Sequence, residues 1–134
     1  MDYRKSAVEL CRAFEGREGR KVANLLNGFK GAYVILRILR DSETDVLSGG
    51  IAKKMDISTA RVAAALNSLS GKGYIKRAPA DNDGRKTVVK ITPSGLQALS
   101  EREELVYSFI EAFLKKLTEE EARAFLSLVK KLFQ

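Results

Sequence analysis

The sequence predicts a mostly helical α+β chain with one small β-hairpin, and three observations lead to this prediction. Apolar residues recur at helical spacing toward both ends of the chain. In the middle, a short helix at 47–55 is separated by the turn "DIS" from a second helix that Ser58 caps. Two alternating stretches, 74–78 and 86–92, then have the period of β-strands. The length of 134 residues predicts a single domain over 1–134.

The N-terminal part of the chain is predicted to be helical. A first helix starts at Tyr3, and "EGREGR" at 15–20 is expected to weaken or break it before the helical pattern resumes. The stretch "GAYVILRIL" at 31–39 is continuously apolar and could be a strand or a buried helix. Its flanks and the polar loop "RDSETD" at 40–45 favour a helix. The apolar positions of the first two helical stretches are Ala7, Leu10, Cys11, Phe14, Val22, Leu25 and Leu26.

The helix capped by Ser58 has two different faces. One face should pack in the core, and it consists of Val62, Ala65, Leu66 and Leu69. The opposite face carries small and polar residues, namely Ala60, Ala64 and Asn67, flanked by Arg61 and Ser68. A helix face of small residues, with a few side chains that can form hydrogen bonds, fits into the DNA major groove, which is about 12 Å wide. Alternatively, the alanines at 63–65 provide only helix propensity on a solvated face. This helix alone does not decide between the two interpretations.

The segment after this helix favours the DNA interpretation. "GKG" at 71–73 should end the helix, and the two predicted strands then form a hairpin whose long polar tip is "PADNDGR" at 79–85. At the tip, Arg85 and Lys86 lie beside Asp81 and Asp83, so an aspartate could brace an arginine for the narrow minor groove. A solvated loop is the alternative. A helix-turn-helix followed by a hairpin defines a winged helix, and a basic hairpin directly after a candidate recognition helix favours DNA binding.

Composition and charge favour an anionic partner, such as nucleic acid or a membrane surface, and argue against catalysis. The net charge is +7, and residues 51–92 hold nine basic and three acidic side chains. The chain has no histidine and one cysteine, which removes the usual general base, Cys-His catalysis and ordinary zinc clusters. The glutamates of "TEEEARAF" at 118–125 fit a helix start, with Thr118 as N-cap and Glu121 in a capping box. We therefore expect no enzyme, no metal and no cofactor.

The sequence also predicts the cellular location of the protein. No apolar run approaches the roughly 20 residues that span a bilayer, and the N-terminus lacks the apolar core of a secretory signal. We expect a cytoplasmic protein with no membrane partner.

The C-terminal part predicts a homodimer. Thr92 caps and Pro93 begins a long helix, and a further helix follows it. Their apolar positions at helical spacing are Leu96, Leu99, Val106, Phe109, Ile110, Phe113, Leu114 and Leu117, then Phe125, Leu126, Val129, Leu132 and Phe133. A winged helix alone cannot cover so much apolar surface, which is typical of an interface. A larger monomeric core is the alternative. A two-fold dimer places two recognition helices about 34 Å apart on one DNA face.

Residues 46–99 contain the motifs "IAKKMDIS", "STARVAAALNSLSGKGYIKR", the wing "DGRK" and the closing "ITPSG". With these motifs the segment resembles the DNA-binding lobe of the MarR family of transcriptional regulators. The resemblance implies a homodimeric winged helix-turn-helix protein that binds palindromic operator DNA, usually as a repressor released by a ligand or an oxidant. The apolar stripes outside the winged helix predict dimerisation helices at 1–30 and 100–134, on either side of a DNA-binding lobe at 31–99. Ala80 is a departure, because many members have an acidic residue at the start of the wing.

The resemblance also implies roles for single residues. Ser58, Thr59, Ala60, Arg61 and Asn67 would face the major groove, Arg85 would enter the minor groove, and Asp83 would brace the wing. The complete set of DNA-binding candidates is Ser58, Thr59, Ala60, Arg61, Ala64, Asn67, Lys76, Arg77, Asp83, Arg85 and Lys86.

Two further interpretations stay open at this point. In some relatives that answer organic hydroperoxides, a cysteine in the first helix, hydrogen-bonded by tyrosines, is the sensor. Cys11 could act in this way with Tyr33 as a partner, but a lone cysteine on an apolar helical face is more often a buried small hydrophobe. No polar cluster identifies a small-molecule effector. The alternative function is a winged helix that binds protein or RNA without reading duplex DNA.

Overall fold

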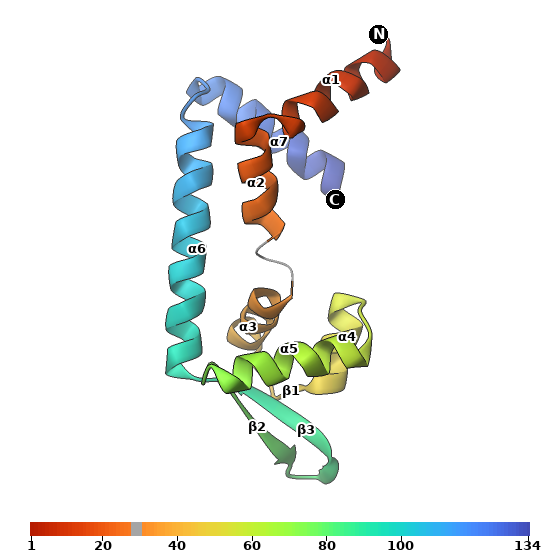
Figure 1. Cartoon of the computed structure of the whole chain (residues 1–134), viewed down its shortest axis with the longest axis vertical. Helices are drawn as coiled ribbons and strands as arrows, with labels where there is room; N and C mark the ends of the chain where they lie inside the picture. Colours follow the sequence, from red (N-terminus) through yellow and green to blue (C-terminus); the bar gives the residue numbers. More distant parts are fainter. Residues whose placement is uncertain (28–30) are drawn as a thin grey trace. The chain divides into compact units, whose positions relative to one another are not determined.

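The computed structural model describes residues 1–27 and 31–134. It divides into two compact units, Met1–Glu101 and Arg102–Gln134, and each is described by itself. The first unit contains a helix-turn-helix and a three-stranded sheet (Figure 1). The predicted dimerisation segment 1–30 ends in residues 28–30, which lie outside the described residues.

The N-terminal segment forms two helices, as predicted. Helix α1 spans Tyr3–Glu15, and the Asp2 side chain caps it by accepting the Lys5 N–H at 3.0 Å. The helix ends at Gly16, whose backbone is extended, and α2 begins directly afterwards at Arg17–Asn27. The predicted break within 15–20 is therefore confirmed. Helices α1 and α2 contact each other.

The helix-turn-helix consists of α4 (Ser48–Met55) and α5 (Thr59–Gly71), and it follows α3 (Ala32–Asp41). The apolar stretch that begins α3 is thus helical, as its flanks favoured. The turn needs no glycine because Asp56 adopts the left-handed conformation, with φ 51° and ψ 47°, a region that Asp tolerates better than most residues. Its N–H donates to the carbonyls of Ala52 and Lys53 and closes the end of α4.

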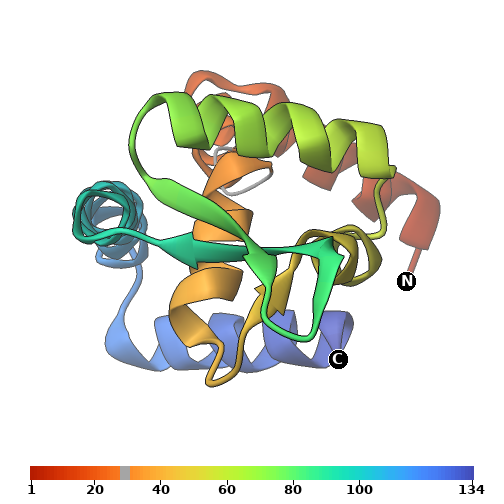
Figure 2. The same ribbon diagram turned by 90° about the horizontal axis from the view of Figure 1, so that it is seen from below.

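The sheet is antiparallel with the order β1-β3-β2, and Figure 2 shows its strands beside α5. Strands β2 (Ile75–Ala80) and β3 (Asp83–Ile91) form the predicted hairpin. Strand β1 (Val46–Leu47), which was not predicted from the sequence, pairs with β3 at Val89 and Val88. Leu47 was expected at the start of the helix, but it lies in this strand, and α4 begins one residue later. Two residues are too short to show an alternating pattern.

The hairpin tip differs from the prediction. The strands extend to Ala80 and Asp83, so the turn between them consists of Asp81 and Asn82 instead of the predicted loop at 79–85. Pro79 suggested a loop, but β2 is an edge strand, and the register shifts between Pro79 and Ala80. A proline is tolerated at such an edge bulge because its missing N–H breaks no inner ladder bond.

The core of the first unit lies between the helices and the sheet. Helix α5 contributes Val62, Leu66 and Leu69, each 2% exposed, and Ala65 packs against the same cluster. This is the face that helical spacing assigned to the core. The other buried members of the cluster are Ile35, Leu36, Leu39, Ile51, Ala52, Ile75, Val89 and Leu99.

Helix α6 (Pro93–Leu114) begins after Thr92 and continues into the second unit, where α7 (Glu119–Phe133) follows it. Leu117 was expected within the long helix, but α6 ends at Leu114 and Leu117 lies in the connecting turn. Thr118 and Glu121 form the predicted capping box at the start of α7. Within residues 1–27 and 31–134, no helix is both long and apolar enough to cross a membrane.

Candidate nucleic-acid interface

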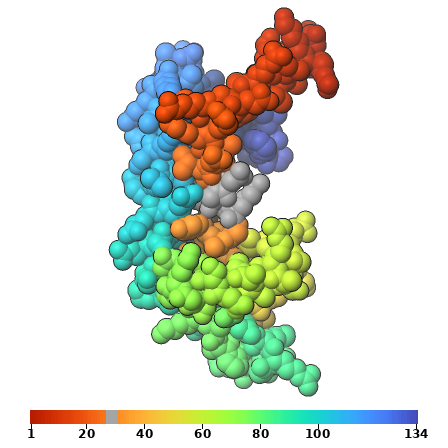
Figure 3. Space-filling view, in the orientation of Figure 1, coloured from red at the N-terminus to blue at the C-terminus, as the bar shows by residue number. Residues whose placement is uncertain are grey.

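The outer face of α5 is exposed along its whole length. Ser58 caps the helix by accepting the Arg61 N–H at 3.2 Å, which fixes the first turn. The exposed residues on or beside this face are Thr59, Ala60, Arg61, Ala64, Asn67 and Ser68. In Figure 3, α5 forms part of the surface of the first unit, and the hairpin projects beyond it. The face that the sequence assigned to the groove is thus slim and open.

The wing is braced at its backbone. The Asp83 carboxylate accepts the backbone N–H of Arg85 at 3.0 Å. The aspartate therefore orders the backbone around Arg85. It does not hold the guanidinium group of Arg85 in place. The side chains of Arg85 and Lys86 are exposed near the tip.

The register of the sheet places Lys76 and Arg77 on opposite faces of β2. Arg77 pairs with buried Val89 and so shares the face that Val89 turns to the core, whereas Lys76 lies opposite exposed Lys90. Two basic neighbours that the sequence analysis grouped together therefore have different environments.

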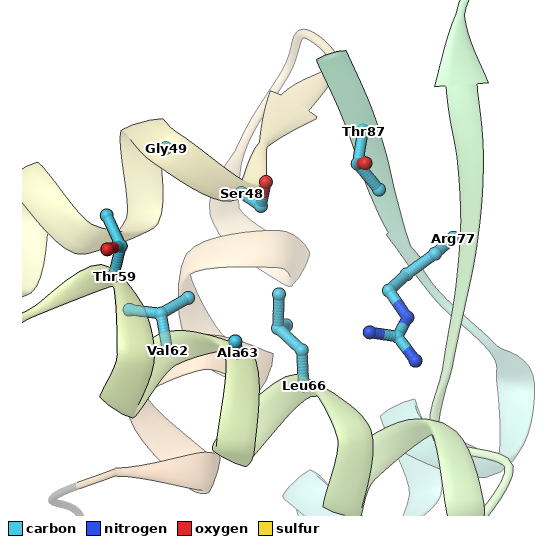
Figure 4. Close-up of a pocket in the computed structure, with 8 residues that line it drawn as sticks. All are labelled: Ser48, Gly49, Thr59, Val62, Ala63, Leu66, Arg77 and Thr87. Atoms are coloured by element: carbon cyan, nitrogen blue, oxygen red, sulfur yellow. The ribbon is translucent and has the colours of Figure 1, made fainter. Parts of the chain in front are cut away.

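The side chain of Arg77 extends from the hairpin to α5. Its Nη1 donates a hydrogen bond of 2.8 Å to Oδ1 of Asn67. Figure 4 shows the side chain directed from β2 toward α5, over a hollow between α4, α5 and the hairpin. The residues that line this hollow are Ser48, Gly49, Thr59, Val62, Ala63, Leu66, Arg77 and Thr87. Asn67 and Arg77 were both predicted to bind DNA, and the structure brings them together.

Four exposed lysines around this region were not singled out by the sequence analysis. They are Lys53 and Lys54 in the last turn of α4, Lys72 at the end of α5, and Lys90 in β3. They belong to the basic middle segment whose charge excess was noted, but a count of charges cannot assign a single lysine to the surface. They extend the positive field around α5 and the wing.

The two residues discussed for redox sensing have different environments. Cys11 lies exposed on α1, so it is not a buried small hydrophobe within this chain. Tyr33 lies on α3 and packs against the core of the first unit.

An exposed, capped helix of small residues beside a basic hairpin defines a winged helix-turn-helix protein of the DNA-binding type. A sequence model described as MarR family matches residues 31–86. The HTH-type transcriptional regulator YwhA of Bacillus subtilis, itself uncharacterized, is 31% identical over 98% of this chain and 88% of its own length. The chain belongs to the MarR family of transcriptional regulators.

Two further comparisons agree with this assignment. The HTH-type transcriptional repressor YetL of Bacillus subtilis is 26% identical, and the match covers 78% of this chain but 64% of YetL. The crystal structure of YusO from Bacillus subtilis has the same fold, with a TM-score of 0.81 over 99% of this chain and 96% of that one, at 20% identity. The predicted mostly helical, winged helix-turn-helix fold is confirmed. The expectation that the protein is a DNA-binding regulator and not an enzyme is confirmed by the family.

Proposed function

We propose that this regulator is a repressor that binds a palindromic operator as a homodimer, with α5 in the major groove and Arg85 in the minor groove. The observation that carries the proposal is the exposed small-residue face of α5 next to the basic wing. The alanines allow close approach, while Arg61 and Asn67 offer hydrogen-bonding groups to base edges. The basic residues of the wing neutralise phosphates.

The dimer proposal rests on two helices that are amphipathic but uncovered. In α1 and α7, both fully described, no residue is buried. Leu132 and Phe133 are 77% and 85% exposed, and Tyr3 is 78% exposed. Apolar surface of this extent costs free energy in water and marks an interface. We assign it to a second copy of the chain, with dimerisation helices at 1–30 and 100–134.

The repressor role is supported by the name of YetL. Release of the operator by a small-molecule ligand or an oxidant is part of the same proposal, through the MarR resemblance. Such a regulator works where chromosomal DNA is, so we propose a cytoplasmic location. Cys11 lies on α1, one of the proposed dimerisation helices, so an oxidant would act on it at the dimer interface.

Selection of bound sequences from a random duplex pool tests the DNA proposal. We expect one enriched motif with two-fold symmetry and half-sites about one helical turn apart. Titration of binding with salt should give a steep dependence, because each phosphate contact releases counterions. Recovery of no motif, with a shallow salt dependence, would support the alternative that this winged helix binds protein or RNA.

Sedimentation at micromolar concentration tests the dimer. A dimer is expected for the unaltered chain, and Leu132→Glu should shift it toward monomer, because a carboxylate would be buried in the interface. Ala64→Glu is the matched control, since it adds the same carboxylate on an exposed face of α5 outside that interface. A monomer that binds its operator with full affinity would exclude the proposed assembly.

A further inference from the structure

We propose that Arg77 positions Asn67 so that this side chain offers only N–H donors to DNA and therefore selects a keto base, guanine or thymine. Arg77 then acts as a positioning residue through a bond within the chain and not as a groove contact. This inference rests on the proposed function, because it needs α5 in the major groove.

The hydrogen bond fixes which end of the Asn67 amide faces Arg77. A guanidinium has donors and no acceptor, so the atom at 2.8 Å from Nη1 must be the carbonyl oxygen Oδ1. The NH2 group therefore points away from Arg77. The bond is charge-assisted, which makes it stronger than a bond between neutral groups.

The sheet explains why Arg77 reaches this position. Buried Ile75 precedes Arg77 by two residues, so both side chains lie on the same face of β2, and Arg77 pairs across the hairpin with buried Val89. On α5, Asn67 directly follows the buried Leu66 and is exposed. The register of the hairpin and the packing of the helix thus bring the two partners together.

The orientation of the amide decides which base it can read. An asparagine that presents both ends pairs with adenine, donating to N7 and accepting from N6. Oδ1 keeps a second lone pair, but the bond turns this atom toward Arg77, so the NH2 group is the end of the amide that is left to face a base. Guanine O6 and thymine O4 can accept from it, whereas the amino groups of adenine and cytosine meet no acceptor. N7 accepts in both purines and so does not distinguish guanine from adenine.

The pairing of Arg77 with Asn67 also keeps a positive charge near the DNA groove. Asn67 is neutral, so the bond leaves the positive charge of Arg77 uncancelled, unlike a pairing with a carboxylate. This charge attracts DNA from a fixed place between helix and wing.

Selection from a random duplex pool, repeated with variants, tests the inference. The unaltered protein should prefer a keto base by about tenfold at one position of each half-site, and Asn67→Ala should abolish that preference. Arg77→Met should move the preference toward adenine, because Oδ1 becomes available. Lys76→Met is the matched control: it removes one charge from the opposite face of β2, so it should weaken binding without changing any base preference.

Asn67→Asp gives a second measurement. It keeps a partner for Arg77 but removes the NH2 donor, so the keto preference should be lost while the thermal midpoint stays the same. Unchanged base preferences in Asn67→Ala, or in Arg77→Met, would overturn the inference while operator binding by the unaltered chain still supported the proposed function. Enrichment of no sequence by the unaltered chain would instead reject the proposed function, and this inference with it.

Discussion

The hydroxyl of Thr92 donates a hydrogen bond of 2.6 Å to the carbonyl oxygen of Gly73. The oxygen of this hydroxyl also accepts the Gly95 N–H at 3.1 Å, and the Thr92 N–H donates to the Tyr74 carbonyl at 3.0 Å. Gly73 has a φ of +75°, which reverses the chain at the end of α5. One threonine thus ties the end of the recognition helix to the start of α6 at the base of the wing.

Thr92→Val should destabilise the protein by about 1–3 kcal/mol, because it removes a helix cap and a second hydrogen bond at once. Thr92→Ser retains the hydroxyl and should recover most of the loss. Chemical denaturation of both variants measures the free energy of unfolding. Equal stability of the valine and serine variants would show that the hydroxyl bonds contribute nothing.

Gly95→Ala should lower the stability of the protein more than the addition of one methyl group suggests. A Cβ at this position would overlap the Tyr74 carbonyl oxygen and lie 2.9 Å from Ile91 Cγ1, so the first turn of α6 would have to move away from the hairpin. Gly71→Ala is the control, because a Cβ there, at the end of α5, would meet no neighbouring part of the described chain within 4 Å. We expect a clear drop in the thermal midpoint for Gly95→Ala alone. A similar midpoint for both variants would contradict the close packing.

Much of this architecture could be predicted because helical spacing is local. The core face of α5, the Ser58 cap and the capping box at Thr118 depend on residues within a few turns of each other, and the structure confirms them. Strand β1 could not be predicted, because its two residues form a strand only through pairing with β3. The hairpin tip was predicted too long because the edge position that tolerates Pro79 is a property of the whole sheet.

The candidate site, too, could be predicted only where local sequence patterns determine it. Its residue types could be predicted from the small residues on the outer face of α5 and from the MarR resemblance, and these residues are exposed except for the half-buried Asp83. The contact between Asn67 and Arg77 joins two elements and depends on the register of the hairpin, which no local pattern specifies. Both residues could therefore be predicted from the sequence, but the bond between them could not.

The capping box of α7 should give the protein an acid-sensitive contribution to stability. The Thr118 backbone N–H donates to the Glu121 carboxylate and lowers the pKa of Glu121 below its ordinary value. A carboxyl group whose pKa is lower in the folded state than in the unfolded state stabilises the fold at pH values above its unfolded pKa. This stabilisation is lost as the pH falls through the pKa of the folded state. Denaturation measured between pH of about 6 and 3 should show that the free energy of unfolding of Glu121→Gln falls less than that of the unaltered protein, because glutamine does not titrate. Identical pH profiles would contradict this role.

Arg85→Ala should weaken binding to most duplexes and reduce the salt slope by about one. Asp83 bonds to the backbone N–H of Arg85, so the wing should keep its shape when the side chain is removed. Base preferences should change little outside A·T-rich flanks, where a narrow minor groove attracts arginine. Binding measured across a salt series checks the slope, and an unchanged slope would count against the minor-groove assignment.

Arg61→Ala tests direct readout by α5. If Arg61 reaches a base edge, its loss should cost roughly 1–3 kcal/mol on the selected operator and relax the preference at one base pair per half-site. The Arg61 N–H that bonds to Ser58 belongs to the backbone, so the helix cap survives. An alanine variant with full operator specificity would assign the readout to other residues.

Ala64→Glu should impair binding more severely than the loss of Arg61. Ala64 is exposed on the slim face, so glutamate would add both bulk and a negative charge facing the phosphates. The buried stripe of Val62, Leu66 and Leu69 is untouched, so the thermal midpoint should hardly change. Operator affinity and thermal unfolding, measured on the same preparation, separate the two effects. Wild-type affinity in a folded Ala64→Glu protein would show that α5 does not enter the groove, whatever else the winged helix binds.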